Sequence, residues 1–188
     1  MSTISPEYLL EQKLLHQNPQ YGVASTVFAP MVASIVRDSR IGSITDYGAG
    51  KKRLIEELQR RGTSGVIYHP YDPAFPEYGE AIPGSDLVTC IDVLEHIEPE
   101  LLENVLLDLK RLNGRLYFFT IHVGPAGKTL SDGRNAHLIQ KPASWWLPRL
   151  CTHFEVAHVQ MHTLMGKGFW CLLYPKTGTD DVNRPIDN

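Results

Sequence analysis

The spacing of hydrophobic residues along the chain predicts alternating helices and strands. Near the N-terminus, Leu10 and Leu14 belong to a helical spacing that starts after Ser5, a residue type that caps helices. From residue 41 onward, short apolar runs alternate with amphipathic stretches, which is typical of helices packed on a parallel sheet. The first predicted helix begins at Pro6, and the others cover about Val27–Arg37, Lys51–Arg61, Leu101–Leu112 and Ala143–Leu150. The predicted strands cover Ile41–Asp46, Gly65–Asp72, Leu87–Ile91, Leu116–Val123, Phe154–Met161 and Gly168–Tyr174.

The last two predicted strands are separated by only a few residues. Such a connection is too short for a helical crossover, so these strands are expected to pair antiparallel. Leu87–Ile91, by contrast, is short and apolar apart from Thr89, as a central parallel strand is. The expected fold class is therefore α/β, a Rossmann-like, doubly wound, mostly parallel sheet with a C-terminal antiparallel strand pair. Ligands of such sheets bind outside the carboxyl ends of the strands, which directs attention to the residues just after each strand.

Composition and charge exclude several classes of protein. The formal net charge of −3 lacks the basic footprint of a protein dedicated to long duplexes, so a nucleic-acid partner is not indicated by charge. No apolar run approaches the roughly 20 residues that span a bilayer, and the first residues do not resemble a signal peptide, so we expect a cytoplasmic protein without a membrane partner. Three cysteines, far apart and odd in number, argue against a disulfide framework or a zinc site.

A glycine-containing loop follows the first strand of the predicted sheet. The run DYGAG (46–50) leads into a helix, whose N-terminus has free N–H groups, and glycine lets the backbone approach a ligand closely. Dinucleotide-binding loops share this pattern. Arg53, however, stands where their fingerprint needs a third glycine, which disfavours a pyrophosphate-binding loop without excluding it.

Asp72 closes the second strand, downstream of this loop. An acidic side chain at that point accepts hydrogen bonds from both ribose hydroxyls of a bound nucleoside. The alternative is that Asp72 and Pro73 only start a turn. The glycine loop upstream favours the ribose role.

A third segment joins a buried strand to titratable residues. The run DLVTCIDVLEHIEPE (86–100) carries Asp92, Glu95 and His96 directly after its apolar part. Taken with DYGAG and YDP (71–73), it resembles the motif series of class I S-adenosylmethionine (SAM)-dependent methyltransferases, over about residues 21–123. Downstream, LSDGRNAH (130–137) followed by two tryptophans is similar to a narrower set of small, uncharacterised, phage-type methyltransferase-like proteins.

The resemblance implies a SAM site built from these motifs. It puts Asp46 near the methionine amino group and Gly48–Gly50 under the carboxypropyl and ribose parts of SAM. It puts Asp72 at the ribose hydroxyls, with Pro73 or Ala74 beside the adenine.

The same resemblance implies that Asp92 and Val93 lie beside the sulfonium and the methyl acceptor. Family members often have glycine where this chain has Lys51, a departure that concerns the geometry of the loop. The predicted cofactor-binding residues are Asp46, Tyr47, Gly48, Ala49, Gly50, Asp72, Pro73, Asp92 and Val93.

Methyl transfer from a sulfonium is an in-line displacement, so the protein mainly positions the acceptor and removes its proton. The candidates for that proton transfer are His122, His137, Asp92 and Glu95. Histidine has the most suitable unperturbed pKa. The alternative is that His122 bonds within the sheet edge and that Glu95 caps or pairs locally.

A polar loop over residues 132–137 is the predicted acceptor-binding lid, with a solvated surface loop as the alternative. Its Arg134 can hold a phosphate or carboxylate bidentately. Trp145 can stack on a base or aromatic acceptor, although one of the two adjacent tryptophans is expected in the core. The predicted acceptor-binding residues are Asp132, Arg134, Asn135 and Trp145.

The leading hypothesis is a SAM-dependent methyltransferase acting on a nucleotide, a nucleic-acid base or a small metabolite. The alternatives are an NAD(P)-binding oxidoreductase of Rossmann type and a non-catalytic binding protein with a cofactor fold. No metal is expected, because His153, His158 and His162 do not share one face of a strand.

The length of 188 residues suits one domain. Residues 1–176 are expected to form it, with N-terminal helices in 1–40, a cofactor-binding half in 41–123, and an acceptor-side loop, helix and last strands in 124–176. The polar residues 177–188 are expected to form a disordered tail.

Overall fold

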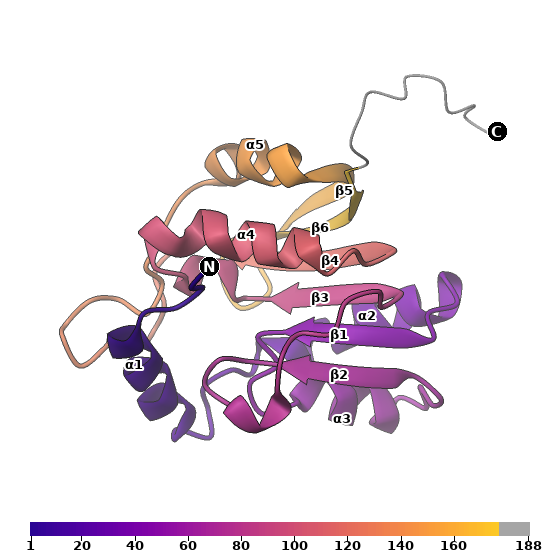
Figure 1. Ribbon diagram of the computed structural model, residues 1–188, viewed down its shortest axis with the longest axis horizontal. Helices are drawn as coiled ribbons and strands as arrows, with labels where there is room; N and C mark the ends of the chain where they lie inside the picture. The colour runs from indigo at the N-terminus through magenta and orange to yellow at the C-terminus, as the bar shows by residue number, and fades with distance from the viewer. Residues whose placement is uncertain (177–188) are drawn as a thin grey trace.

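A computed structural model describes residues 1–176, whose six strands form one sheet in the order β2-β1-β3-β4-β6-β5 (Figure 1). The pairs β1–β2, β1–β3 and β3–β4 are parallel, whereas β6 is antiparallel to both β4 and β5. This confirms the predicted mostly parallel α/β sheet with an antiparallel C-terminal pair. The predicted tail, 177–188, lies outside the described residues. The strands are β1 (Ser43–Tyr47), β2 (Ile67–Tyr71), β3 (Leu87–Ile91), β4 (Leu116–His122), β5 (Phe154–His162) and β6 (Gly168–Pro175).

Helices cover both faces of the sheet. On one face, α4 and α5 pack over β3, β4 and β6 around a core that contains Phe119 and Trp146. On the other face, α2 and α3 pack over β1 and β3, with Phe28 and Leu54 fully buried. No helix within residues 1–176 is long and apolar enough to cross a bilayer. The helices are α1 (Pro6–His16), α2 (Ala24–Asp38), α3 (Arg53–Arg60), α4 (Leu102–Arg111) and α5 (Ala143–His153), with short 3-10 turns η1 (Pro76–Tyr78), η2 (Leu94–His96) and η3 (Pro99–Leu101).

The first helix, α1, lies apart from these two layers, at the carboxyl ends of the parallel strands (left in Figure 1). Ser5 caps it, because its side chain accepts the Tyr8 N–H. Leu10 and Leu14 are 62% and 54% exposed, whereas Tyr8 is only 3% exposed. The apolar spacing therefore predicted the helix correctly, but the leucines that define this spacing are not on the buried face of the helix.

Three helix boundaries differ by two or more residues from those expected. α3 begins at Arg53 instead of Lys51, because Lys52 has left-handed backbone (φ 59°) and cannot continue a right-handed helix. α2 begins at Ala24, three residues early, and α5 continues past Leu150 to His153.

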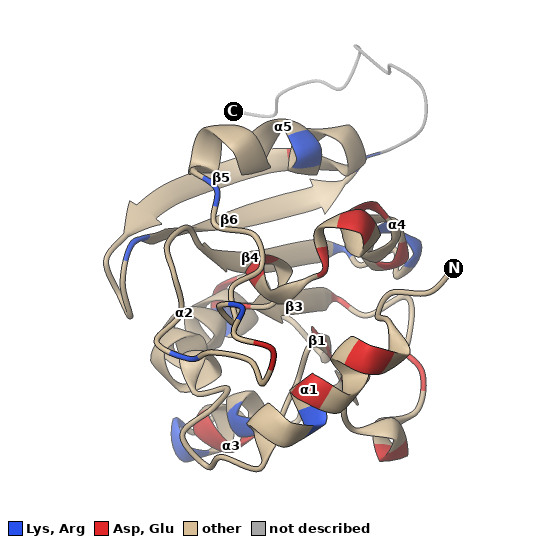
Figure 2. Cartoon of the chain, turned by 90° about the vertical axis from the view of Figure 1, so that its left-hand side faces the viewer, with Lys and Arg blue, Asp and Glu red and all other residues tan. Residues whose placement is uncertain are grey.

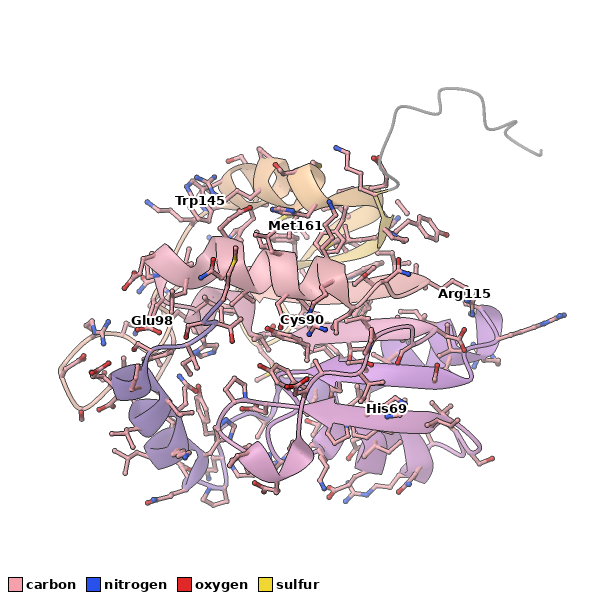
Figure 3. The ribbon with its side chains drawn as sticks, viewed as in Figure 1. His69, Cys90, Glu98, Arg115, Trp145 and Met161 are labelled. Atoms are coloured by element: carbon pink, nitrogen blue, oxygen red, sulfur yellow. The ribbon has the colours of Figure 1, made fainter. Side chains whose placement is uncertain are left out.

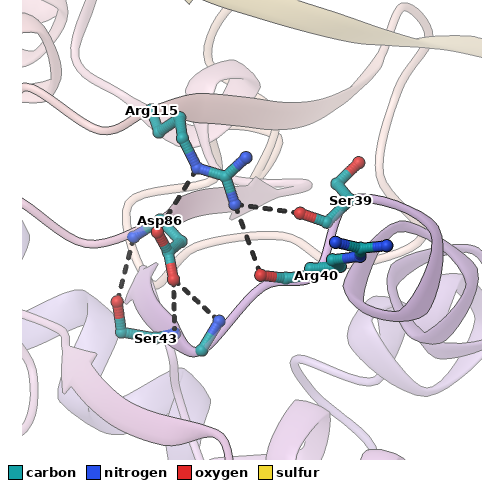
Figure 4. A network of polar contacts seen from close by, with 6 residues as sticks. Ser39, Arg40, Ser43, Asp86 and Arg115 are labelled. Carbon is teal, nitrogen blue, oxygen red and sulfur yellow. Dashed lines mark hydrogen bonds and ion pairs between the residues drawn. The ribbon is translucent and has the colours of Figure 1, made fainter.

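A polar network ties the amino ends of β1, β3 and β4 together (Figure 4). The Asp86 carboxylate accepts the N–H groups of Gly42 (2.7 Å) and Ser43 (3.2 Å), and Arg115 contacts it at 3.3 Å. The backbone bond from Gly42 is the main reason that the pKa of Asp86 lies below its ordinary value. This network holds the strands at the end opposite α1, so that their carboxyl ends line up at the other edge.

Candidate functional site

A cavity of about 370 Å³ lies where α1 covers the carboxyl ends of β1, β2 and β3. Its volume falls within the range of about 300–1,000 Å³ usual for ligand sites. The cavity is the meeting point of segments that are far apart in sequence. Of the predicted site residues, those that line it are Asp46, Tyr47, Gly48, Ala49, Gly50, Asp72, Pro73, Asp92, Val93, His122 and His137.

Gly48 lets the loop after β1 pass directly against the segment after β3. It has φ +80°, and a Cβ atom on it would clash with Cγ2 of Val93. Valine is stiff about χ1, so its methyl groups cannot move aside freely. The close contact between Gly48 and Val93 therefore depends on the missing side chain.

We predict that Gly48→Ala destabilises the protein more than Gly62→Ala does. Gly62 has nearly the same φ (+78°) but no atom within 4 Å of its would-be Cβ, so its substitution measures backbone strain alone, about 1–2 kcal/mol. Gly48→Ala adds overpacking, which costs about a further 1–3 kcal/mol. Urea unfolding measures both changes. Val93→Ala in the Gly48→Ala background should recover the excess, and equal losses for the two glycine variants would refute the close contact.

Asp72 links the second strand to the glycine loop. Its Oδ2 accepts the Gly50 N–H at 2.9 Å, and its Oδ1 accepts the Ala74 N–H at 2.8 Å. Burial raises the pKa of this carboxyl above its ordinary value. Each oxygen of a carboxylate can accept more than one hydrogen bond, so Asp72 keeps capacity for a ligand in the cavity.

Asp46 lies deeper, at the end of β1. Its Oδ1 accepts a hydrogen bond from Thr89 Oγ1 at 2.6 Å, and its Oδ2 accepts one from the Tyr68 hydroxyl. Burial raises its pKa to about 6, against the lowering effect of the two hydroxyl groups. The carboxylate therefore lines the cavity with both oxygens held in place.

Lys51 does not distort the glycine loop. Its backbone is outside the left-handed region, and its ammonium donates to the carbonyls of Asn18 (2.8 Å) and Tyr21 (3.2 Å). The left-handed residue is the next one, Lys52. Lys51 thus ties the loop to the segment that follows α1.

Asp92 follows β3 in left-handed backbone, with φ 51°. Such conformations cost about 1–3 kcal/mol in non-glycine residues and cluster at functional sites. Thr120 holds it in place, because its hydroxyl accepts the Asp92 N–H at 2.9 Å and donates to the Asp92 carboxylate at 2.6 Å. Burial raises the pKa of this carboxyl, and the nearby His122 and His137 act in the opposite direction.

Three histidine rings form a chain beside Asp92. The His137 ring centre is 4.8 Å from that of His122 and 4.6 Å from that of His96. His137 Nδ1 is 2.8 Å from the Gly124 carbonyl oxygen, which can only accept, so Nδ1 carries the proton and Nε2 has a free lone pair. Burial lowers the pKa of His137, and it lowers the pKa of His96 to about 3. These two rings are therefore neutral at neutral pH.

Glu95 is fully buried beneath this chain, not at the cavity wall. Its Oε1 accepts the His122 N–H at 2.8 Å, and its Oε2 has no hydrogen-bond partner in the described part of the chain. Burial first, and the Asp92 charge second, raise the pKa of Glu95 well above its ordinary value. In this position Glu95 fixes the end of β4 instead of reaching a ligand.

The loop predicted to bind the acceptor packs against α1. Arg134 and Asp132 are exposed and pair with each other at 2.6 Å. Asn135 bonds to the backbone of Ala126, to which it donates at 2.8 Å, and it accepts the His137 N–H at 3.0 Å. Asn135 therefore shapes the loop next to His137, the pair of Asp132 and Arg134 lies at the surface, and the cavity wall is made by other residues.

Trp145 lies on α5, above α4 in the view of Figure 3, away from the cavity under α1. Its ring stacks under the Arg149 guanidinium at 3.6 Å, and Trp146 beside it is fully buried. The structure does not bring Trp145 to the candidate site, because its helix packs on the sheet one layer away.

Sequence reasoning missed the contribution of α1. Tyr8, Gln12 and His16 line the cavity from this helix, together with Tyr21 after it. Their spacing of four residues was the available signal. A polar stripe at that spacing also describes a solvated helix face, so the sequence alone does not distinguish the two.

The charges around the cavity favour a cationic ligand over an anionic one. Asp46, Asp72, Asp92 and Glu98 line it, whereas Lys128 is the one lysine or arginine that does so within residues 1–176. Figure 2, which faces the carboxyl ends of the strands, shows both acidic and basic residues on α1 and on α3. Among residues 1–176, no cluster of His, Cys, Asp or Glu is arranged to hold a metal ion.

Comparison with known proteins finds relatives by structure only. No family model and no curated protein sequence matches the chain. A structure of 1,6-didemethyltoxoflavin-N1-methyltransferase from Burkholderia thailandensis, with bound 1,6-didemethyltoxoflavin and S-adenosylhomocysteine, matches 94% of this chain and 93% of its own, with TM-score 0.62 and 16% identity. Magnesium protoporphyrin IX methyltransferase from Synechocystis PCC 6803, with bound SAM, matches 94% of this chain and 100% of its own, with TM-score 0.59 and 16% identity.

A third match, mitomycin 7-O-methyltransferase, covers 88% of this chain and 60% of its own, with TM-score 0.62 and 12% identity. The named acceptors of these three proteins differ widely. At such low identity the matches establish that the chain has the Rossmann-like fold of these methyltransferases.

Proposed function

We propose that this protein is a SAM-dependent methyltransferase with a small-molecule or nucleotide-like acceptor. The observation that carries the proposal is the single cavity in which the glycine loop, Asp72 and the segment Asp92–Val93 meet. In open α/β sheets this is where ligands bind. The solved methyltransferases that share the fold, with SAM or S-adenosylhomocysteine bound, support the choice of cofactor.

The adenosine end of SAM fits the edge formed by Asp72. Its two oxygens have capacity left for the ribose 2′- and 3′-hydroxyls, while the Gly50 and Ala74 N–H groups hold the carboxylate in place. Pro73 and Ala74 line the cavity next to it and offer an apolar surface for the adenine. Asp72 is therefore assigned to the ribose.

The methionine end fits beside Gly48 and Ala49, which line this part of the cavity. Asp46 lines this part of the cavity and offers a carboxylate to the amino group of SAM. The excess of carboxylates also suits a ligand that carries a sulfonium cation. The Lys51 side chain lies outside the cavity lining and donates to the Asn18 carbonyl, so lysine at this position is compatible with SAM binding.

SAM, when bound, supplies a methyl group activated on its sulfonium. The protein residues near Asp92 then have to orient the acceptor and take its proton. His137 is the best base, because its Nε2 lone pair is free and burial keeps the ring neutral at pH 7. The Asp92 carboxylate, held by Thr120, stabilises the imidazolium that forms, since its charge raises the pKa of His137. His122 lines the same wall, and Glu95 is a positioning residue beneath it.

Residues 1–176 are proposed to work as one domain. Residues 41–123 hold the cofactor, and residues 124–176 contribute the loop that orients His137. The N-terminal helices do more than expected, because α1 forms part of the cavity wall.

The glycine loop and the sheet would also suit an NAD(P)-binding oxidoreductase, but the start of the next helix does not. For an oxidoreductase, the start of α3 would have to accept a pyrophosphate. There Lys52 is left-handed and the Arg53 side chain reaches back to the Pro19 carbonyl. A non-catalytic binding protein would have no need of a free base such as His137.

Titration calorimetry tests the proposal. We expect micromolar binding of SAM and S-adenosylhomocysteine and none of NADH or NADPH. Absence of heat and of a thermal shift with both SAM compounds would overturn the proposal, and a response to NAD(P)H alone would favour the oxidoreductase. Cofactor binding without transfer of a labelled methyl group to any cell fraction would favour the non-catalytic protein.

A further inference from the structure

One face of α1 presents three polar side chains to the cavity. Tyr8, Gln12 and His16 are spaced by four residues and therefore lie on the same side of the helix. All three line the cavity. The Tyr8 hydroxyl, Gln12 Nε2 and His16 Nδ1 are buried and have no hydrogen-bond partner among residues 1–176.

Unpartnered buried polar atoms are uncommon in native proteins, because each lacks the hydrogen bond that water would supply. Three of them lie on one helix face, in side chains that line one cavity, and this indicates that a ligand entering the cavity completes their bonding. In the structure the Tyr21 hydroxyl donates to Gln12 Oε1 at 3.1 Å. The free Gln12 atom is therefore the amide nitrogen, a donor.

The face runs from the cofactor half to the acceptor half of the cavity. His16 packs against Gly50 and edge-on to Phe75, with ring centres 4.9 Å apart. Tyr8, at the other end and 3% exposed, packs with Leu130 and Ala136 of the loop that orients His137. Tyr8 and Gln12 therefore line the part of the cavity that is left for an acceptor.

Neutral rings make up much of the surroundings of these two residues, and the charged groups that act on Tyr8 are the Glu98 carboxylate and the exposed pair of Asp132 and Arg134. Tyr21, His96 and His137 line the same space, and burial keeps both histidines neutral. Burial also raises the pKa of Tyr8, so its hydroxyl stays protonated. An anionic acceptor would meet mainly carboxylates here, whereas a flat, neutral molecule would meet ring faces and hydrogen-bonding groups.

We propose that Tyr8 and Gln12 recognise the methyl acceptor, an uncharged planar heteroaromatic molecule with a lactam-type edge. Gln12 Nε2 donates to its carbonyl oxygen, and the Tyr8 hydroxyl accepts its ring N–H. This proposal rests on the proposed methyltransferase function. It assigns to α1 the choice of acceptor, and it favours a free small molecule over a base within a nucleic acid, since α1 covers the cavity.

Fragment binding to the protein saturated with S-adenosylhomocysteine tests it. The neutral probes are 2-pyridone, uracil and 4-quinazolinone, and the matched anions are nicotinate, orotate and benzoate. We expect ligand-observed NMR to detect the neutral probes and not the anions. Tyr8→Phe and Gln12→Leu should each weaken neutral-probe binding about fivefold, the effect of one hydrogen bond, with little change in S-adenosylhomocysteine affinity.

Gln17→Leu is the matched control, because Gln17 is exposed at the end of the same helix. It should leave probe binding unchanged. Preference for the anions, binding of neither set, or equal binding of the neutral set by wild type and both variants would overturn the proposal. Failure of the wild type to bind S-adenosylhomocysteine would instead overturn the proposed function itself.

Discussion

Replacing Asp72 with alanine is expected to weaken S-adenosylhomocysteine binding by about 100-fold. Hydrogen bonds to a charged group contribute about 1.5–3 kcal/mol each, and the variant loses the acceptor for two ribose hydroxyls. It also frees the N–H groups of Gly50 and Ala74, which Asp72 holds at 2.9 and 2.8 Å. The glycine loop then loses its link to β2, so the cavity is less well formed before the ligand arrives. Titration calorimetry measures the affinity.

Two variants separate the ribose contact from general charge effects. Asp72→Asn keeps one acceptor oxygen and should lose less affinity than Asp72→Ala. Glu77→Ala removes an equal charge from an exposed residue five positions on, and should change affinity little. A loss with Glu77→Ala as large as with Asp72→Ala, or an unchanged affinity in Asp72→Ala, would remove Asp72 from the ribose site.

Most of the fold follows from patterns that depend on local physics. Leu87–Ile91, apolar apart from Thr89, is the buried central strand β3, and the short connection before Gly168 gives the antiparallel pair. The sequence does not predict a helix boundary that depends on the backbone angles of a single residue. Lysine has no preference for left-handed backbone, so the sequence does not predict this conformation at Lys52, and α3 starts later than expected, at Arg53.

The part of the cavity that is proposed to hold the cofactor was predictable because strand order brings the ends of β1, β2 and β3 together. Gly48, Asp72 and Asp92 each follow one of these strands. The acceptor part was not, because it depends on how two connecting segments pack. Arg134 and Trp145 were expected to bind the acceptor, but they pair with Asp132 and Arg149 instead. Tyr8 and Gln12 line the cavity because α1 packs over it.

Glu95 shows a second limit of sequence reasoning. Its position in the VLEH motif predicted a catalytic acid or base, and its carboxyl group is instead buried against the backbone of His122. Burial raises its pKa, so the folded protein holds the Glu95 proton at pH values where the unfolded chain releases it. A motif residue can therefore support the site through its neutral form.

We predict that Glu95→Gln becomes increasingly stabilising, relative to wild type, as pH rises above 4.5. Because the pKa of Glu95 is raised on folding, its contribution is fully present below the ordinary value of 4.5 and is lost as pH rises through the folded pKa. Glutamine stays neutral at every pH and keeps an acceptor for the His122 N–H. The difference in unfolding free energy should grow by about 1.4 kcal/mol per pH unit over that interval. Urea unfolding from pH 4 to 8 measures it.

Two further variants test whether the pH dependence comes from Glu95: Glu100→Gln and Glu95→Ala. Glu100 is exposed on the same segment, and its substitution should leave the pH dependence of wild type unchanged. Glu95→Ala removes the acceptor of a buried N–H and opens a cavity, so its unfolding free energy should lie about 3 kcal/mol below that of Glu95→Gln at all these pH values, because neither replacement titrates. A pH-independent difference between Glu95→Gln and wild type would mean that Glu95 is ionised in the folded protein. In that case its charge, and not its neutral carboxyl, would have to hold the end of β4 in place beside Asp92.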